Sequence, residues 1–291
     1  MKFSAAIVLS AVVCLASSAS AVPTAPIKAG KYFNRVLTVV FENADYDDVM
    51  ADPYFKSLGE RNNGIALTQF FAQFHPSQPN YIAMITGGRD SVSNSKVNIN
   101  KRNLVDLLEG GRVSWKSYQE NYPGNCFVGD SSDRLYVRKH NPFISMNNVR
   151  TNPARCANIV GSAELAKDVA AGTAPQYIFY TPNMDNCGHD TSIGYSSKWA
   201  KGFLEPLLAN TEFMNSTLVI ITWDESENYF NDNQVATYLL GPMVDGAKSK
   251  TDNTKYSHYS ILKTIEDNWS LGSLGRSDVS ATTFARLKTN E

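Results

Sequence analysis

This chain of 291 residues has no excess of charge of one sign, no long apolar runs and no unusual amount of glycine or proline. Lys and Arg number 27 against 28 Asp and Glu, with no basic block, which argues against binding of nucleic acid or anionic membranes mainly through charge. With Gly 18 and Pro 12, collagen-like and low-complexity chains are excluded as well. Beyond the N-terminal segment, no stretch is apolar enough to span a membrane. What remains is a globular protein long enough to bury a substantial core.

The first 21 residues have the pattern of a secretory signal peptide. Lys2 supplies a positive start, residues 7–15 form an apolar run too short to cross a bilayer, and Ala19-Ser20-Ala21 is a small-residue cleavage site. We therefore expect a secreted mature chain of residues 22–291. Because no internal repeat and no Pro/Ser-rich linker divides it, a single domain is predicted.

Cysteine is scarce, with only four in the chain, and Cys14 would leave with the signal peptide. The odd number that remains, Cys126, Cys156 and Cys187, leaves one thiol unpaired in an oxidising compartment. Cys126 and Cys156 lie in the same loop-rich stretch, so we pair these two, although spacing alone does not exclude the other pairings. Two sequons, at Asn215 and Asn268, are candidate glycan sites.

Buried strands alternate with helical patterns along the chain. Three β-branched, nearly continuous apolar runs are typical of strands buried on both faces: 35–41, 176–180 and 217–223. Two weaker runs, 65–71 and 235–240, and four helical patterns lie around them: 103–109, 163–171, 198–209 and 259–269. This alternation predicts an α/β fold with three α/β/α layers around a mostly parallel sheet. Such sheets bind ligands beyond the carboxyl ends of their strands.

Carboxylates follow two of these runs directly. Glu42 and Asn43 come after the first run and can both present oxygen to a hard cation, although Asn43 can equally cap the helix that follows. Asp224 and Glu225 come after the third. Two adjacent carboxylates at the mouth of a buried strand repel one another unless a cation or protons compensate, which favours a metal over a solvated loop.

Ser77 stands just before a predicted helix, because Pro79 suits a first helical turn. An N-terminus of this kind favours an anion such as a phosphoryl group or an alkoxide. Ser77 is therefore a candidate nucleophile, with simple helix capping as the alternative.

Three of the four histidines lie near these strand ends. Asp185 and His189 are four apart after the second run, and both are good ligands for zinc or a similar ion; an Asx-turn with an exposed histidine is the alternative. His258 stands at the start of the last predicted helix; it is a candidate metal ligand, with a role as a helix cap as the alternative. His75 precedes Ser77 and has no assigned role.

The segments FENADYDDV, FHPSQPNYIAMITGG, YTPNMDNCGHD, VIITWDESE and SHYSILKTIED resemble the secreted phosphoesterase family that includes fungal acid phosphatases and bacterial phospholipases C. That family belongs to the alkaline-phosphatase-like superfamily. The resemblance runs from about residue 35 to 269, in the expected order. It implies an alkaline-phosphatase-like fold and hydrolysis of phosphate esters.

The resemblance also implies roles for individual residues. Ser77 matches the nucleophile, and Asn80 the amide that hydrogen-bonds a phosphoryl oxygen. A first metal site would comprise Glu42, Asn43, Asp224 and Glu225. A second, as in two-metal relatives, would comprise Asp185, His189 and His258. His140, next to Lys139, could contact phosphate or protonate the leaving group, with a solvated rim as an equal alternative.

One departure affects the identity of the metal. Many two-metal members have Asp-His where this chain has Asp224-Glu225, and Asp in place of Glu42. Replacing imidazole by oxygen shifts preference from Zn towards Mg, Ca or Mn. The cofactor is therefore expected to be one or more divalent metal ions, of open number and identity.

The expected function is that of a secreted, metal-dependent acid phosphatase that hydrolyses small phosphomonoesters through a phosphoserine intermediate. A phosphodiesterase or phospholipase C acting at the same site is one alternative, and a non-catalytic secreted binding protein is another. A sulfatase is disfavoured because Tyr81 stands where that motif needs Arg. Neither a nucleic-acid partner nor stable membrane association is expected, and the oligomeric state is open.

Overall fold

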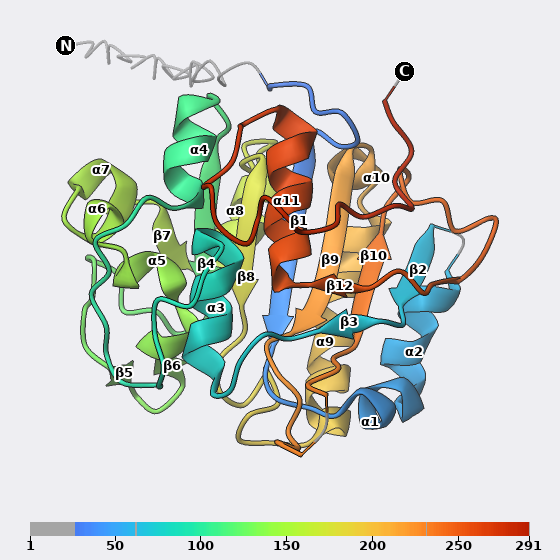
Figure 1. Cartoon of the computed structure of the whole chain (residues 1–291), viewed down its shortest axis with the longest axis horizontal. Helices are drawn as coiled ribbons and strands as arrows, with labels where there is room; N and C mark the ends of the chain where they lie inside the picture. The colour runs from blue at the N-terminus through green and yellow to red at the C-terminus, as the bar shows by residue number, and fades with distance from the viewer. Residues whose placement is uncertain (1–26, 62, 231, 291) are drawn as a thin grey trace, which may run out of the picture.

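The computed structural model describes residues 27–61, 63–230 and 232–290, so the predicted signal peptide lies outside the described residues. An eight-stranded sheet in the order β11-β2-β10-β9-β1-β8-β4-β7 runs through the molecule (Figure 1). Its centre is parallel and is formed by β9 (Thr217–Trp223), β1 (Arg35–Phe41), β8 (Tyr177–Thr181), β4 (Trp115–Gln119) and β7 (Ile159–Gly161). The predicted strands 35–41 and 217–223 are confirmed with the same bounds, and 176–180 is displaced by one residue.

The other edge of the sheet is mixed. β10 (Thr237–Leu240) runs antiparallel to both β9 and β2 (Gly64–Leu67), and β11 (Thr251–Asp252) is parallel to β2. β3 (Phe70–Phe71) leaves the main sheet and pairs with β12 (Tyr256–Ser257). The weaker run 65–71 is thus divided between two sheets.

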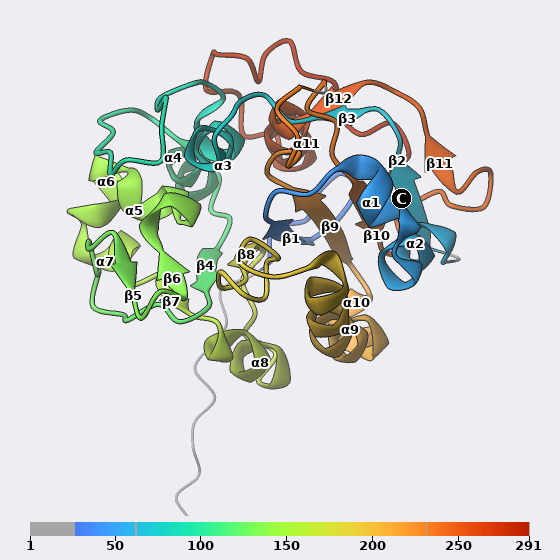
Figure 2. The same cartoon turned by 90° about the horizontal axis from the view of Figure 1, so that it is seen from below.

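Helices cover both faces of the sheet (Figure 2). One face carries α3 (Ser77–Thr86), α4 (Leu104–Gly110) and α11 (His258–Trp269). The other carries α8 (Ala163–Ala170), α9 (Ile193–Ala209) and α10 (Thr211–Met214), while α1 (Tyr46–Ala51) and α2 (Pro53–Glu60) lie towards the β2 edge. This arrangement confirms the predicted α/β/α fold with a mostly parallel sheet.

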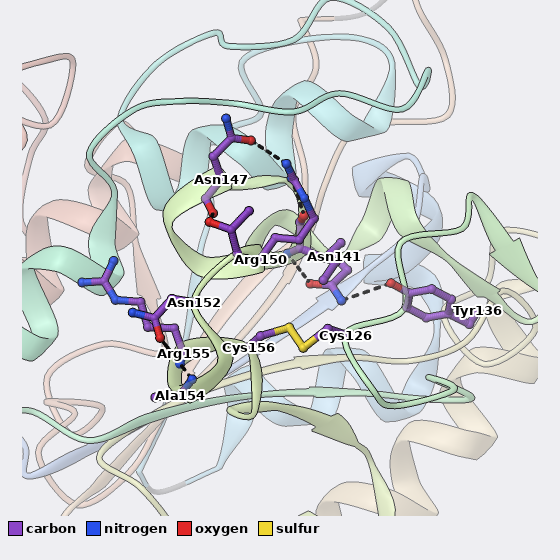
Figure 3. The surroundings of a disulfide bond; sticks show 11 residues. Cys126, Tyr136, Asn141, Asn147, Arg150, Asn152, Ala154, Arg155 and Cys156 are labelled. Carbon is purple, nitrogen blue, oxygen red and sulfur yellow. Dashed lines mark hydrogen bonds between the residues drawn. A yellow bond between two sulfur atoms is a disulfide. The ribbon is translucent and has the colours of Figure 1, made fainter.

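The loop-rich excursion between β4 and β7 contains only short elements. These are β5 (Ser131–Ser132), β6 (Tyr136–Val137), the 3-10 turn η1 (Arg138–His140), α5 (Pro142–Ser145), α6 (Asn147–Arg150) and α7 (Pro153–Cys156). The Cys126–Cys156 disulfide closes it, with the two Cα atoms 5.8 Å apart (Figure 3). Cys187 is a buried thiol, the one free cysteine in the described part of the chain. The predicted pairing is confirmed.

The two sequons have opposite environments. Asn215 is exposed in the turn before β9. Asn268 is 2% exposed; its Oδ1 accepts from the N–H groups of Tyr32 and Phe33 at 2.8 and 3.1 Å, and its Nδ2 donates to the carbonyl of Phe33. In this fold Asn268 is the less accessible of the two candidate glycan sites, because its amide nitrogen already serves as an internal donor.

None of the helices within the described ranges is both long and apolar enough to cross a bilayer.

Candidate active site

Ser77 is the first residue of α3 and is 3% exposed. Its Oγ lies 3.0 Å from Oε2 of Glu42 and 3.0 Å from Oε1 of Glu225. Glu42 follows β1 and Glu225 follows β9; these strands are parallel neighbours with Phe41 opposite Trp223. The register therefore carries both carboxylates to the same edge of the sheet, as the rule for open parallel sheets predicts.

The N-terminus of α3 offers fewer N–H groups to an anion than most helices do. Pro79 has none, and the N–H of Gln78 donates to Oδ1 of Asn94 at 3.0 Å. Ser77 makes no side-chain capping bond, and Pro76 occupies the cap position. The capping alternative for Ser77 is not seen, which leaves its hydroxyl to the two carboxylates.

Glu42 is fully buried and is backed by a histidine. Nε2 of His140 lies 2.9 Å from Glu42 Oε1, although without the alignment of a good hydrogen bond. Burial alone would raise the pKa of Glu42, but the His140 contact and the nearby charge of Lys139 outweigh it and hold the pKa below its usual range. Glu42 is therefore the ionised member of the acidic group.

Asp224 and Glu225 are buried beside Glu42, at 0% and 2% exposure. Within the described residues, neither carboxylate oxygen of Asp224 has a hydrogen-bond partner. Burial, and then the charges of Glu42 and Glu225, raise the pKa of Asp224 well above its usual value, and burial together with Glu42 raises that of Glu225 to about 8. Burying three carboxyl groups close together costs free energy, because their charges are desolvated and repel one another, and a bound cation would offset this cost.

A divalent metal fits this group. Glu42, Asp224 and Glu225 supply only hard oxygen donors, and the two orphaned oxygens of Asp224 need a partner. Asn43 is half-buried next to Glu42. Over residues 27–290 apart from 62 and 231, no set of three His, Cys, Asp or Glu side chains is already converged as a metal cluster. The acidic group is thus gathered around Ser77 without closing into a cage.

The second predicted set of metal ligands is not assembled. Asp185 is held by Arg134 through two contacts of 2.8 and 3.0 Å, so its charge is already balanced. Nε2 of His258 donates to the carbonyl of Trp223 at 3.0 Å, and the ring is fully buried, which lowers the pKa of His258 to about 4. His258 thus lies behind the first acidic group, apart from the surface pairing of Asp185. A second metal held by Asp185, His189 and His258 therefore stays a prediction from the resemblance.

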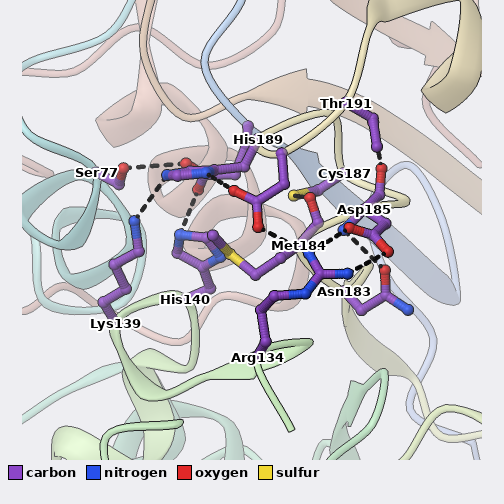
Figure 4. A network of polar contacts seen from close by, with 12 residues as sticks. Ser77, Arg134, Lys139, His140, Asn183, Met184, Asp185, Cys187, His189 and Thr191 are labelled. Atoms are coloured by element: carbon purple, nitrogen blue, oxygen red, sulfur yellow. Dashed lines mark hydrogen bonds and ion pairs between the residues drawn. The ribbon is translucent and has the colours of Figure 1, made fainter.

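His189 and Lys139 meet near Ser77 (Figure 4). Nδ1 of His189 lies 2.7 Å from Oδ1 of Asp190, and its Nε2 lies 3.1 Å from Nζ of Lys139. Asp190 also pairs with Arg134 at 3.1 Å. A chain of polar contacts therefore runs from Arg134 at the surface through Asp190 and His189 to the half-buried ammonium of Lys139.

The structure changes the interpretation of His140. The ring is 2% exposed, which excludes a solvated rim, and it stacks on Tyr81 with centroids 5.0 Å apart. Burial lowers the pKa of His140, although the contact with Glu42 acts in the opposite direction. The observed partner of His140 is Glu42, and its part in phosphate binding or leaving-group protonation stays a prediction.

The side chain of Asn80 already makes hydrogen bonds to the backbone of the preceding loop. Its Oδ1 accepts from the N–H groups of Gln73 and Phe74, and its Nδ2 donates to the carbonyl of Phe74 at 2.7 Å. One N–H of the amide is left, so the phosphoryl contact of Asn80 stays a prediction.

Sequence reasoning missed three contributors: Tyr81, Arg134 and the contact between His75 and Glu225. Their roles depend on partners far along the chain, and the residues around Arg134 carry no motif. Only His75 had a local signal, its position two residues before Ser77.

Comparisons with known proteins agree with the fold and identify the family. A family model described as Phosphoesterase family matches residues 51–272. A probable acid phosphatase of Kluyveromyces lactis is 42% identical over 275 residues, which cover 90% of this chain and 65% of that protein. An acid phosphatase of Aspergillus fumigatus is 38% identical over 277 residues, which cover 91% of this chain and 62% of that protein. The chain thus spans a little under two thirds of these fungal relatives.

A solved structure from Vibrio parahaemolyticus, described as a protein in the alkaline phosphatase superfamily, has the same fold. It matches with a TM-score of 0.60 at 11% identity, over 90% of this chain and 73% of that one. Together with the match to the family model, these likenesses establish that the chain belongs to the Phosphoesterase family.

Proposed function

We propose that this protein is a secreted, metal-dependent acid phosphatase that hydrolyses small phosphomonoesters through a phosphoserine intermediate. The observation that carries the proposal is the Ser77 hydroxyl, held 3.0 Å from carboxylates that follow two neighbouring strands. The names of the fungal relatives support the same reaction class. The N-terminal sequence pattern is the basis for secretion.

The chemistry assigned to Ser77 is an in-line displacement. Its Oγ forms a bond to phosphorus as the bond from phosphorus to the leaving oxygen breaks, and the hydroxyl proton passes to a neighbouring carboxylate. Water then cleaves the phosphoserine and releases inorganic phosphate. A divalent ion held by Glu42, Asp224 and Glu225 would supply Lewis acidity and lower the pKa of Ser77; these oxygen donors favour Mg, Ca or Mn over Zn.

Lys139 and His189 are the groups we assign to the substrate side. The Lys139 charge acts on both Glu42 and Glu225, so it lies within range of a phosphoryl group placed on Ser77. Nδ1 of His189 donates to Asp190, which fixes the ring and turns Nε2 towards Lys139. The pair can attract the anionic ester and steady the leaving oxygen.

The decisive test compares the wild type with Ser77→Ala on p-nitrophenyl phosphate from acid to neutral pH, before and after chelation. Loss of the nucleophile should lower kcat by a factor on the order of 10³ or more. Ser197→Ala is the matched control, because Ser197 is also buried but lies on α9, on the other face of the sheet from α3, where its hydroxyl donates to Asp52.

Equal turnover by wild type and Ser77→Ala would mean that the site is misassigned. Wild-type activity that survives chelation would remove the metal from the proposal and leave the serine chemistry. A larger kcat/KM on bis-p-nitrophenyl phosphate than on the monoester would reassign the enzyme as a diesterase.

A further inference from the structure

Glu225 is fixed by two contacts from one short segment. Its Oε1 faces the Ser77 hydroxyl, and its Oε2 is in contact with Nδ1 of His75, two residues earlier. The Glu225 side chain is 3% exposed and that of His75 is 18% exposed, so this pair is largely shielded from water. The orientation of the carboxylate therefore depends on His75 as much as on Ser77.

His75 itself has only one polar anchor among the described residues. When Glu225 is ionised, as a metal ligand would be, its Oε2 accepts and Nδ1 of His75 carries the proton, whereas Nε2 is buried without a hydrogen-bond partner anywhere in the described ranges. A single hydrogen bond leaves the ring free to rotate about it. Something else must fix the plane of the imidazole.

The ring of Tyr229 supplies that second constraint. It stacks on His75 with centroids 3.9 Å apart and an interplanar angle of 28°. Tyr229 is 58% exposed, so burial of its own surface does not explain this position. Its neighbour Phe230 is 99% exposed and serves as a natural comparison on the same loop.

The loop that carries Tyr229 is tied to both sides of the site. The N–H of Asn228 donates to Oδ1 of Asp45, after β1, at 2.9 Å. Asn233 accepts from the N–H of Ser226 at 2.9 Å and donates from Nδ2 to the carbonyl of Phe74, the residue before His75. These bonds hold Tyr229 against His75 on a loop that projects beyond the carboxyl end of β9 (Figure 1).

We propose that His75, clamped by the ring of Tyr229, is a positioning residue that orients Glu225 towards Ser77 and the metal. The inference rests on the proposed metal site and adds residues that hold a ligand from outside it. Groups of this kind typically change metal affinity by 10–100-fold when they are replaced. Neither His75 nor Tyr229 needs to touch the substrate for this effect.

The test titrates the full mature chain with Mn²⁺ alone and follows free Mn²⁺ by electron paramagnetic resonance, with no substrate present. His75→Leu should raise the Kd for Mn²⁺ by about 10–100-fold. His75→Asn keeps a donor near the position of Nδ1 and should recover most of the affinity. Tyr229→Leu should weaken binding, whereas Tyr229→Phe, which keeps the ring, and Phe230→Leu, which removes only an exposed neighbour, should not.

Each result has a defined meaning. Wild-type affinity in His75→Leu, with or without a lower Tm, would overturn the inference and leave the metal site standing. If Tyr229→Leu raises KM for an aryl phosphate but leaves the Kd for Mn²⁺ unchanged, Tyr229 contacts substrate and the clamp is refuted. If the wild type binds no Mn²⁺, the proposed metal site fails and the positioning role fails with it.

Discussion

The two glutamates beside Ser77 are supported in the same way. Each has one carboxylate oxygen near the Ser77 hydroxyl and the other against a histidine, His140 for Glu42 and His75 for Glu225. Each histidine in turn stacks on a tyrosine ring. Asp224 lacks such support, because its two oxygens have no hydrogen-bond partner in the described part of the chain. At the scale of single residues, Asp224 is the member of the acidic group that most needs a cation.

This contrast predicts opposite effects of Asp224→Asn on stability and on function. Removing a buried, unpartnered carboxylate should stabilise the metal-free protein by on the order of 1 kcal/mol or more, because the repulsion from Glu42 and Glu225 falls. The same change should weaken Mn²⁺ binding and activity together. Thermal unfolding with chelator and with Mn²⁺ measures both effects.

Asp48→Asn, on the exposed surface of α1, is the control for loss of one negative charge. A metal-free Tm that falls in Asp224→Asn, or an unchanged Mn²⁺ stoichiometry, would contradict the assignment of Asp224.

At the scale of elements, α11 covers part of one face of the sheet and carries Glu266 near its C-terminal end, far from His258. Glu266 is 1% exposed, with both oxygens unpartnered among the described residues. It faces Asp278, whose carboxylate accepts from the N–H groups of Leu274, Gly275 and Arg276. Burial, and then the charge of Asp278, raise the pKa of Glu266 to about 8. The end of α11 is thus packed most favourably when Glu266 is protonated.

A pH dependence of stability follows from Glu266. Between its ordinary value of 4.5 and about 8, the folded state binds more protons at Glu266 than the unfolded state does. The contribution of Glu266 is therefore complete below about pH 4.5 and is lost as the pH rises towards 8. Glu266→Gln should raise the Tm at pH 8 relative to wild type and leave it nearly unchanged at pH 5.

Unfolding curves recorded from pH 5 to 8.5 check this expectation. Glu60→Gln, on the exposed end of α2, gives the effect of removing a carboxylate that is not buried. Parallel pH profiles for wild type and Glu266→Gln would rule out the proposed coupling between Glu266 and Asp278.

At the scale of the whole molecule, Asn268 fastens the start of the chain to the end of α11. Its amide bonds to the backbone of Tyr32 and Phe33, and nearby Asn290 donates to the carbonyl of Lys31 at 2.8 Å. The two ends of the described chain are therefore joined through one face of the fold. Asn215, in contrast, is exposed in the turn before β9.

Glycosylation in a secreting eukaryotic host should therefore occur at Asn215 alone. Asn215→Gln should remove the mass shift released by peptide N-glycosidase F and leave the Tm nearly unchanged. Asn268→Gln should leave the glycan mass unchanged and lower stability by about 1–3 kcal/mol, because buried backbone groups lose their partner. A glycopeptide containing Asn268 would contradict this reading of the fold.

The sequence by itself predicted the elements whose pattern is local. β1 and β9 are continuous apolar runs, and both were bounded correctly; Pro79 placed Ser77 at a helix start. β4 was missed because Lys116, Ser117 and Gln119 interrupt its apolar pattern. Lys116 pairs with Asp168 on α8, and Gln119 donates to Thr181 on β8 as well as to Ser117 on its own strand. Likewise, the helix expected after Asn43 is divided in two, because Asp52 ends α1 and its side chain caps α2.

The candidate site divides in the same way. Strand-end carboxylates and a serine before a helix could be recognised from sequence, because each depends on its immediate neighbours and on the general topology of parallel sheets. Only the tertiary structure decided which oxygens meet Ser77, since Glu225 lies 148 residues away. It also decided that His140 is buried against Glu42, and that Arg134 forms an ion pair with Asp185. Ion pairing and burial depend on the distances between residues that are far apart along the chain. Those distances are set by the folded structure and cannot be read from local sequence patterns.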